Sequence, residues 1–195
     1  MTLYASTAQI KAALRITDTV DDALLDVAGS AASDLIDRHC ERTFGTVSAS
    51  RYFAPSDGLL CQVDDLAGTA VSVYTSSSAN GTYDVTWTAS DYQLEPGTTS
   101  GITTPFTRIR AVGNYMFPDA YGETTVKVTG VFGWPEVPPS IIQAAVIQAS
   151  RLFKRLDSPL GVAGVSDIGV MRVSRGLDPD VAQLVAPFKR VGGIR

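Results

Sequence analysis

The feature that most constrains this chain is a hydrophobic period that changes twice. Residues 1–45 follow a helical period, residues from about 46 to 134 alternate as strands do, and residues from Pro138 onward return to a helical period. Helices that flank one β segment predict an α+β fold. We therefore expect a helical bundle from residues 1–45 and 137–195, with an inserted antiparallel β subdomain at 46–136, which a chain of 195 residues can accommodate.

Two helices are expected before residue 45. Ser6 and Gln9 form a capping box, which opens a short first helix. Asp18 or Thr19 is expected to cap a second helix that ends near Cys40. A helical wheel of the second helix gives an inner face of Leu24, Ala28, Ala31, Ala32 and Leu35.

The opposite face of the second helix is acidic. Its members are Asp26, Asp34, Asp37 and Glu41. A charged helix face ordinarily meets water. The alternative interpretation is that this face lines a channel and repels passing DNA, so that the duplex slides without sticking.

Residues 72–104 are expected to form a small, largely exposed antiparallel sheet, because 14 of these 33 residues are serine or threonine. Asn80 and Gly81 between two strand patterns predict a hairpin. The expected strands are residues 51–53, 69–74, 83–87, 106–112 and 124–131.

The third segment begins with Pro139 in the first turn of a helix that runs to about Leu156. Its apolar residues cover more than one face, so we expect burial on two sides, partly against other subunits. A mean hydropathy of +0.11 with 18% charged residues favours such association. The glycine-spaced residues 161–169 are interpreted as a flexible connection. Asp178 is expected to cap a last helix, and residues 188–195 to form a basic, flexible tail.

Charge argues against a protein that wraps nucleic acid, because 20 acidic residues exceed 16 basic ones. Residues 137–195 nevertheless hold eight basic and four acidic residues, so this end should seek an acidic partner. No basic and apolar leader is expected to direct secretion, and no apolar stretch is long enough to span a membrane.

No enzyme, cofactor or metal site is expected. His39 is the single histidine and stands near no nucleophile motif, and Cys40 and Cys61 are interpreted as small buried residues. The pairs Asp64 with Asp65 and Asp178 with Asp180 are interpreted as a strand end and a helix cap rather than catalytic carboxylates.

Several segments together resemble the head-to-tail connector (adaptor) proteins of long-tailed bacteriophages. The resemblance covers about residues 2–53 and 126–190, and the serine- and threonine-rich middle is not diagnostic. The segments are 42–45 (RTFG), 128–138 (VTGVFGWPEVP) with the alanine-rich helix that ends at 151–155 (RLFKR), 158–161 (SPLG), 169–175 (GVMRVSR), 178–181 (DPDV) and 184–190 (LVAPFKR).

The resemblance implies a structural virion protein of the neck, assembled in the host cytoplasm. Such a protein would form a ring, expected to be dodecameric, that docks beneath the portal protein. The ring would offer a platform to head-closure (stopper) or tail-terminator proteins, and genomic DNA would pass through its lumen without specific binding.

The resemblance also suggests roles for residues. The residues expected to bind the portal are Arg172, Arg175, Phe188, Lys189 and Arg190. Those expected at the subunit interface are Ile141, Ile142, Val146 and Phe153. The acidic face of the second helix is expected to line the lumen. One alternative is a head-closure or tail-completion ring protein. A more distant one is a carbohydrate-binding module or small hydrolase, with Trp87, Tyr83 and Tyr92 as a sugar platform.

Overall fold

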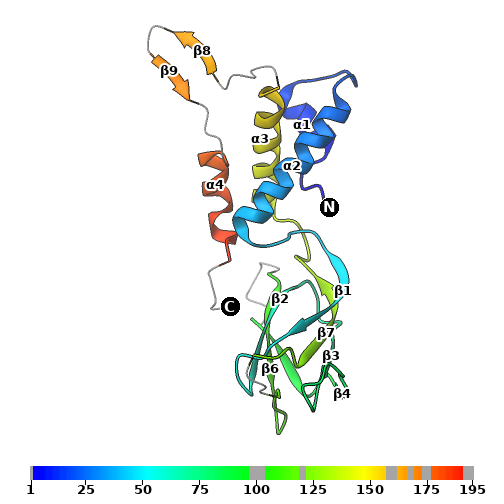
Figure 1. Ribbon diagram of the computed structural model, residues 1–195. Helices are drawn as coiled ribbons and strands as arrows, with labels where there is room; N and C mark the ends of the chain where they lie inside the picture. Colours follow the sequence, from blue (N-terminus) through cyan, green and yellow to red (C-terminus); the bar gives the residue numbers. More distant parts are fainter. Residues whose placement is uncertain are drawn as a thin grey trace. The chain divides into compact units, whose positions relative to one another are not determined.

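The computed structural model describes residues 2–96, 104–118, 122–156 and 177–190, and the backbone alone of residues 162–166 and 169–172. The chain divides into two compact units, drawn in Figure 1. We call Met1–Phe44 with Val137–Arg195 the helical unit, and Gly45–Glu136 the β unit. The four helices and the seven-stranded antiparallel sheet found in these described residues confirm the predicted α+β class.

Helix α1 (Thr7–Leu14) begins at the predicted capping box. The Ser6 hydroxyl accepts the Gln9 amide, and the Gln9 side chain accepts the Ser6 amide. Helix α2 (Asp22–Cys40) ends where the sequence predicts but begins later. The predicted cap was wrong, because Asp18 accepts the amide of Val20 at 3.1 Å and so closes a turn before the helix.

The buried face of α2 is rotated from the predicted one. Leu24 is 48% exposed, whereas the next residue, Leu25, is fully buried. The rotation arises because small residues lie in the contact: Ile10 packs against Gly29, and the Tyr4 amide donates to Ser33 Oγ at 3.1 Å. The buried residues of α2 are Leu25, Ala28, Gly29, Ala32, Ser33, Ile36 and Cys40.

Helix α3 (Pro139–Lys154) carries Pro139 in its first turn, as predicted. It packs against α1, α2 and α4 (Pro179–Val185), and Figure 1 shows it between α2 and α4. Helices of the same chain therefore bury Ile141, Ala144, Ala145 and Ala149, which is one part of the apolar surface of α3. Asp178 caps α4 by accepting the amide of Asp180 at 2.9 Å, and a 3-10 turn (Ala186–Phe188) follows.

The predicted flexible connection was wrong. Strands β8 (Val162–Ser166) and β9 (Gly169–Arg172) form an antiparallel hairpin in that part of the chain. The glycines suggested flexibility, but Val162, Val165 and Val170 give both segments the β-branched residues that favour strands.

The β unit is built from seven strands in the order β4-β3-β7-β2-β6-β5, with β1 paired to β7. Five of them overlap the expected strands, and β2 and β5 were missed. The strands are β1 (Val47–Phe53), β2 (Leu60–Leu66), β3 (Ser72–Thr75), β4 (Val85–Trp87), β5 (Tyr92–Glu95), β6 (Phe106–Ala111) and β7 (Val126–Phe132).

The predicted hairpin at Asn80 and Gly81 is confirmed. Strands β3 and β4 pair antiparallel on either side of it, with Val73 opposite Trp87. Gly81 has a positive φ of 80°, and the Asn80 side chain accepts the Thr82 amide at 3.0 Å, so both residues build the turn as their types favour.

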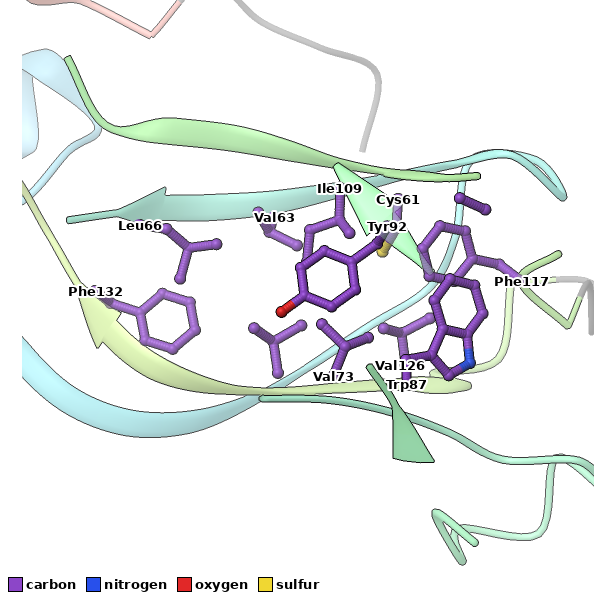
Figure 2. Close-up of a cluster of buried hydrophobic side chains, with 12 residues drawn as sticks. Cys61, Val63, Leu66, Val73, Trp87, Tyr92, Ile109, Phe117, Val126 and Phe132 are labelled. Atoms are coloured by element: carbon purple, nitrogen blue, oxygen red, sulfur yellow. The ribbon is translucent and has the colours of Figure 1, made fainter. Parts of the chain in front are cut away.

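The β unit has a hydrophobic core, to which residues 72–104 contribute Val73, Trp87 and Tyr92. Figure 2 shows Trp87 close to Phe117; their rings stack with centroids 4.5 Å apart. Trp87 is 5% exposed and Tyr92 8%, so neither belongs to a sugar platform on the surface. The core comprises Cys61, Val63, Leu66, Val73, Trp87, Tyr92, Ile109, Ala111, Phe117, Val126, Val128 and Phe132.

A close backbone approach joins the two ends of the β unit. Gly133 has a φ of +116°, and a Cβ atom there would lie 1.9 Å from the carbonyl oxygen of Gly45. The Gly133 amide also donates to the Asp65 carbonyl oxygen at 2.7 Å. Only glycine fits this conformation and this space.

Candidate functional site

The carboxylates of Asp64 and Asp65 make separate structural contacts. Asp64 forms an ion pair with Arg51 at 2.7 Å, and the buried Asp65 accepts the indole N–H of Trp134 at 3.1 Å. Neighbouring strand residues point to opposite faces, so the two carboxylates do not form a pair. His39 lies half-buried on α2.

Both cysteines are buried and reduced. Burial raises the pKa of the Cys40 thiol to about 11 and that of the Cys61 thiol to about 12, so both remain protonated at neutral pH. Within the described ranges, no cluster of three or more His, Cys, Asp or Glu residues could hold a metal ion. Nor does any helix in the described part of the chain have the length and apolar character to cross a membrane.

The segment proposed to bind the portal begins with residues that pack against their own unit. The ring of Phe188 meets the ring of Phe44 edge to face, with centroids 5.9 Å apart. The Arg190 amide donates to the carbonyl oxygen of Cys40 at 2.9 Å. Residues 188–190 are thus fixed to the end of α2, which corrects the expectation of a flexible tail from Phe188 onward. Residues 191–195 lie outside the described residues.

Lys189 is exposed between these two anchored residues. Of the other residues in the portal-binding prediction, Arg172 is described only as a backbone position of β9, and Arg175 lies outside the described residues. Lys189 is therefore the member of the set whose side chain the structure shows to be available to a partner.

Helix α4 is attached to α3 through its cap. Asp178 pairs with Arg151, and the Asp178 amide donates to Oε1 of the buried Gln148 at 3.1 Å. A carboxylate that caps one helix and pairs with a cation on another fixes both the start of α4 and its position on α3.

An aromatic network near the start of the chain was not predicted. The Tyr4 hydroxyl donates to Asp37 Oδ1 at 2.5 Å and accepts the Phe44 amide at 2.9 Å, and the Tyr4 and Phe44 rings contact edge to face. Burial raises the pKa of Asp37 above its ordinary value, an effect that the Tyr4 hydrogen bond opposes. The contact spans 40 residues of sequence, so no local pattern indicates it.

The four residues of the predicted acidic face differ in their contacts. Asp26 accepts the Thr7 hydroxyl, Asp34 pairs with Arg38, and Asp37 binds Tyr4. Glu41 is exposed at the C-cap of α2. Three of the four carboxylates thus have partners within the chain.

The residues predicted for the subunit interface are unequally accessible. Ile141 has no exposed surface and belongs to the core of the helical unit, so it has nothing to offer a neighbour. Ile142, Val146 and Phe153 are half-buried. They follow a spacing of four and seven residues along α3, so they lie on one side of that helix.

A more exposed apolar surface lies on α2. Val20 just before the helix is 85% exposed, Leu24 48% and Val27 68%, and Ala31 is exposed as well. The spacing of Leu24, Val27 and Ala31 places these three residues in one row along the helix, and Val20 lies in the turn that precedes it. We call Val20, Leu24, Val27 and Ala31 the α2 stripe. Leu24 and Ala31 were predicted for the inner face of α2, and both are exposed instead.

Comparisons with known proteins show the fold. No protein-family model and no curated protein matches the chain. A solved structure described as the neck of an empty GTA (gene transfer agent) particle, computed with C6 symmetry, contains a chain that matches with a TM-score of 0.59 and 17% identity. The match covers 100% of this chain and 95% of that one.

A second match comes from the neck of a native GTA particle, computed with C12 symmetry. Its TM-score is 0.53 at 16% identity, with the same coverage of 100% and 95%. At such low identity the two matches establish a shared fold over the whole chain, including both units.

Proposed function

We propose that this chain is a structural protein of the neck of a phage-like particle, a head-to-tail adaptor. The observation that carries the proposal is the match of the entire chain, helical unit and β unit together, to chains from GTA necks. The resemblance of residues 128–138 and of the C-terminal segments to head-to-tail connector proteins supports it independently. The role is assembly, without a reaction.

In this proposal identical copies form a ring around the path of the DNA. The C6 and C12 symmetries of the matching necks favour six or twelve copies, and we propose twelve. The acidic side of α2, with Asp26, Asp34, Asp37 and Glu41, would face the lumen and let DNA pass without specific binding. The protein would be made in the host cytoplasm and located in the neck of the finished particle.

The portal protein is the proposed partner above the ring. Lys189 is exposed beside an anchored backbone, and Arg172, Arg175 and the final residues add positive charge in the same part of the sequence. We propose that Phe188 and Arg190 hold this segment in place, and that the basic side chains engage an acidic portal surface. Head-closure (stopper) or tail-terminator proteins would bind the opposite end of the ring.

Localisation in particles tests the neck role. Labelling the chain in purified particles and imaging them should place it between head and tail, and particles made without it should be heads that lack tails. Chains found in the tail tube or on the capsid surface would contradict the proposal.

Portal binding needs a separate test, because removal of residues 187–195 would also remove the Phe188 contact to Phe44. Lys189→Glu and deletion of residues 191–195 should each weaken co-purification with the portal, whereas Gln183→Glu on the exposed side of α4 should not. A chain that binds tail proteins and ignores the portal would instead be a head-closure or tail-completion protein.

A further inference from the structure

The α2 stripe is an apolar surface that the chain's own helices leave uncovered. The opposite side of α2 carries the buried residues that contact α1 and α3. The helix therefore has two apolar sides, and one of them meets solvent in a single copy. A row of large apolar residues with 48% to 85% exposure is typical of a protein interface rather than of a solvated helix face.

The charges beside the α2 stripe restrict what can cover it. Asp18 and Asp21 lie beside Val20 at the start of the stripe, whereas at its other end Asp34 is paired with Arg38, which lies in line with Ala31. A two-fold contact of this stripe with itself would join two copies and could not continue around a ring, so a different surface should cover it. The complementary surface should be apolar and bordered by positive charge.

The same chain contains such a surface on α3. Ile142, Val146 and Phe153 form a half-buried apolar row, and we call these three residues the α3 stripe. Lys154 is exposed next to Phe153, and Leu156 is 58% exposed just beyond the helix. The α3 stripe thus combines accessible apolar side chains with a positive end.

We infer that the α2 stripe of one copy packs against the α3 stripe of the next copy in the ring. The inference rests on the proposed function, since it names the contact by which that ring would close. A contact between two different surfaces repeats from copy to copy, and it closes into a ring when the rotation permits. Burial of the two apolar rows would stabilise the contact. The acidic border of one stripe and the basic border of the other would fix the orientation of the two helices.

Cysteine cross-linking tests the pairing. Val27 and Val146 lie near the centres of the two stripes, so a short bifunctional maleimide should join Val27→Cys of one chain to Val146→Cys of another. The native thiols of Cys40 and Cys61 should react little with the maleimide, because both are buried and their pKa values are raised. The double variant should give a ladder of covalent oligomers, both in concentrated purified protein and in assembled particles.

Each single-cysteine variant is the matched control. A mixture of the two single variants should yield cross-linked dimers, and neither variant alone should. Efficient cross-linking of Val27→Cys with itself would indicate a symmetric contact and overturn the inference. Absence of the Val27 to Val146 product both in concentrated protein and in particles would overturn it as well.

A charge variant gives a second measurement. Val27→Glu changes an exposed residue, so the single copy should fold as before, but the buried carboxylate should weaken self-association about tenfold or more. Gln183→Glu makes the same charge change on α4 and should leave association unchanged. A ring that persists with Val27→Glu and lacks the cross-link would overturn this contact while leaving the neck role in place. A chain absent from the neck would refute the function instead.

Discussion

Phe44 is the residue on which the two ends of the helical unit meet. Its ring contacts Tyr4 near the start of the chain and Phe188 near the end, and its amide donates to the Tyr4 hydroxyl. Since α2 ends at Cys40, this cluster also holds the residues that follow the helix, up to Phe44, within the helical unit. The individual residues are visible in the sequence, but their contacts depend on positions far apart in the chain.

Phe188→Ala should destabilise the helical unit. The side chain is half-buried, so the loss should be about 2 kcal/mol, below the range for a fully buried phenylalanine. Thermal unfolding followed by far-UV circular dichroism measures it. Lys189→Ala, which removes an exposed neighbouring side chain, should change the midpoint little; an equal effect of both would contradict the role of the Phe188 contact.

Gly133→Ala should destabilise the β unit by about 2 kcal/mol or more, because alanine is strained at a φ of +116° and its Cβ would meet the Gly45 carbonyl. Denaturant unfolding followed by tryptophan fluorescence measures this unit alone, since Trp87 and Trp134 are the two tryptophans of the chain and both lie there. Gly68→Ala, at a glycine with open space around its Cβ position, is the control and should change stability far less.

Among the helices, the sequence correctly predicted those starts that depend on residues close to one another in the chain. The capping box at Ser6, the proline at the start of α3 and the Asp178 cap all depend on neighbouring residues, and all three are confirmed. Asp18 was misassigned because the same side chain type closes turns as well as helices.

Strands β2 and β5 were missed because their patterns carry weak strand signals. Strand β2 contains Asp64 and Asp65, and aspartate is depleted in strands. Here Asp64 forms an ion pair with Arg51, and Asp65 accepts the indole N–H of Trp134. Strand β5 holds Glu95, whose carboxylate is paired with Arg110 of the neighbouring strand at 2.5 Å. Cross-strand partners cannot be identified until the pairing of the strands is known.

Asp178→Ala should loosen α4 from α3 by about 1 to 2 kcal/mol, because the substitution removes both the helix cap and the pairing with Arg151. Faster amide hydrogen exchange in α4, with little change in the β unit, is the expected measurement. Asp180→Ala removes an exposed carboxylate of the same helix and should have a smaller effect. Equal exchange in the two variants would contradict the cap.

At the scale of the whole molecule, the two units should respond to acid in opposite directions. Hydrogen bonds from Ser77, Thr88 and Arg110 lower the pKa values of Asp84, Asp91 and Glu95 respectively, all in the β unit. A carboxyl group whose pKa is lower in the folded than in the unfolded chain stabilises the fold at pH values above its ordinary pKa, here 3.8 to 4.5. This stabilisation is lost as the pH falls through the lowered pKa.

Burial of Asp37 in the helical unit has the opposite sign. Its pKa is raised, so the folded unit binds that proton more readily, and this contribution improves as the pH falls towards 3.8. Acidification should therefore unfold the β unit first: tryptophan fluorescence should change at a higher pH than the helical circular dichroism signal. Simultaneous transitions, or loss of the helices first, would contradict this order.

Asp91→Asn tests one of the groups responsible. Asp91 accepts the Thr88 amide at 2.6 Å and the Thr88 hydroxyl at 2.7 Å, so the variant should lower the stability of the β unit at neutral pH and reduce its dependence on pH. Denaturant unfolding at neutral and acidic pH, followed by fluorescence, measures both. Asp180→Asn makes the same charge change in the helical unit and should leave the fluorescence transition unchanged.

The double change of period was enough to predict the α+β class, and the resemblance of the terminal segments led to the neck proteins that share the fold. Which helix faces are covered was not predictable in the same way. The buried face of α3, with Ile141, Ala144, Ala145 and Ala149, packs against helices of its own chain. The exposed row on α2 depends on a small shift of that helix's buried face at Gly29 and Ser33. Such shifts depend on the contacts between helices, and a helical wheel shows only the residues of one helix.

The pairing of β1 with β7 brings the entrance and exit of the β unit together, with Val47 opposite Phe132. A segment whose two ends are neighbours can be exchanged by recombination as a cassette, because the distance between its ends stays short whichever segment is inserted. Related particles could then vary this cassette to suit different neighbouring proteins while retaining the helices, and comparative genomics should find its length more variable than theirs.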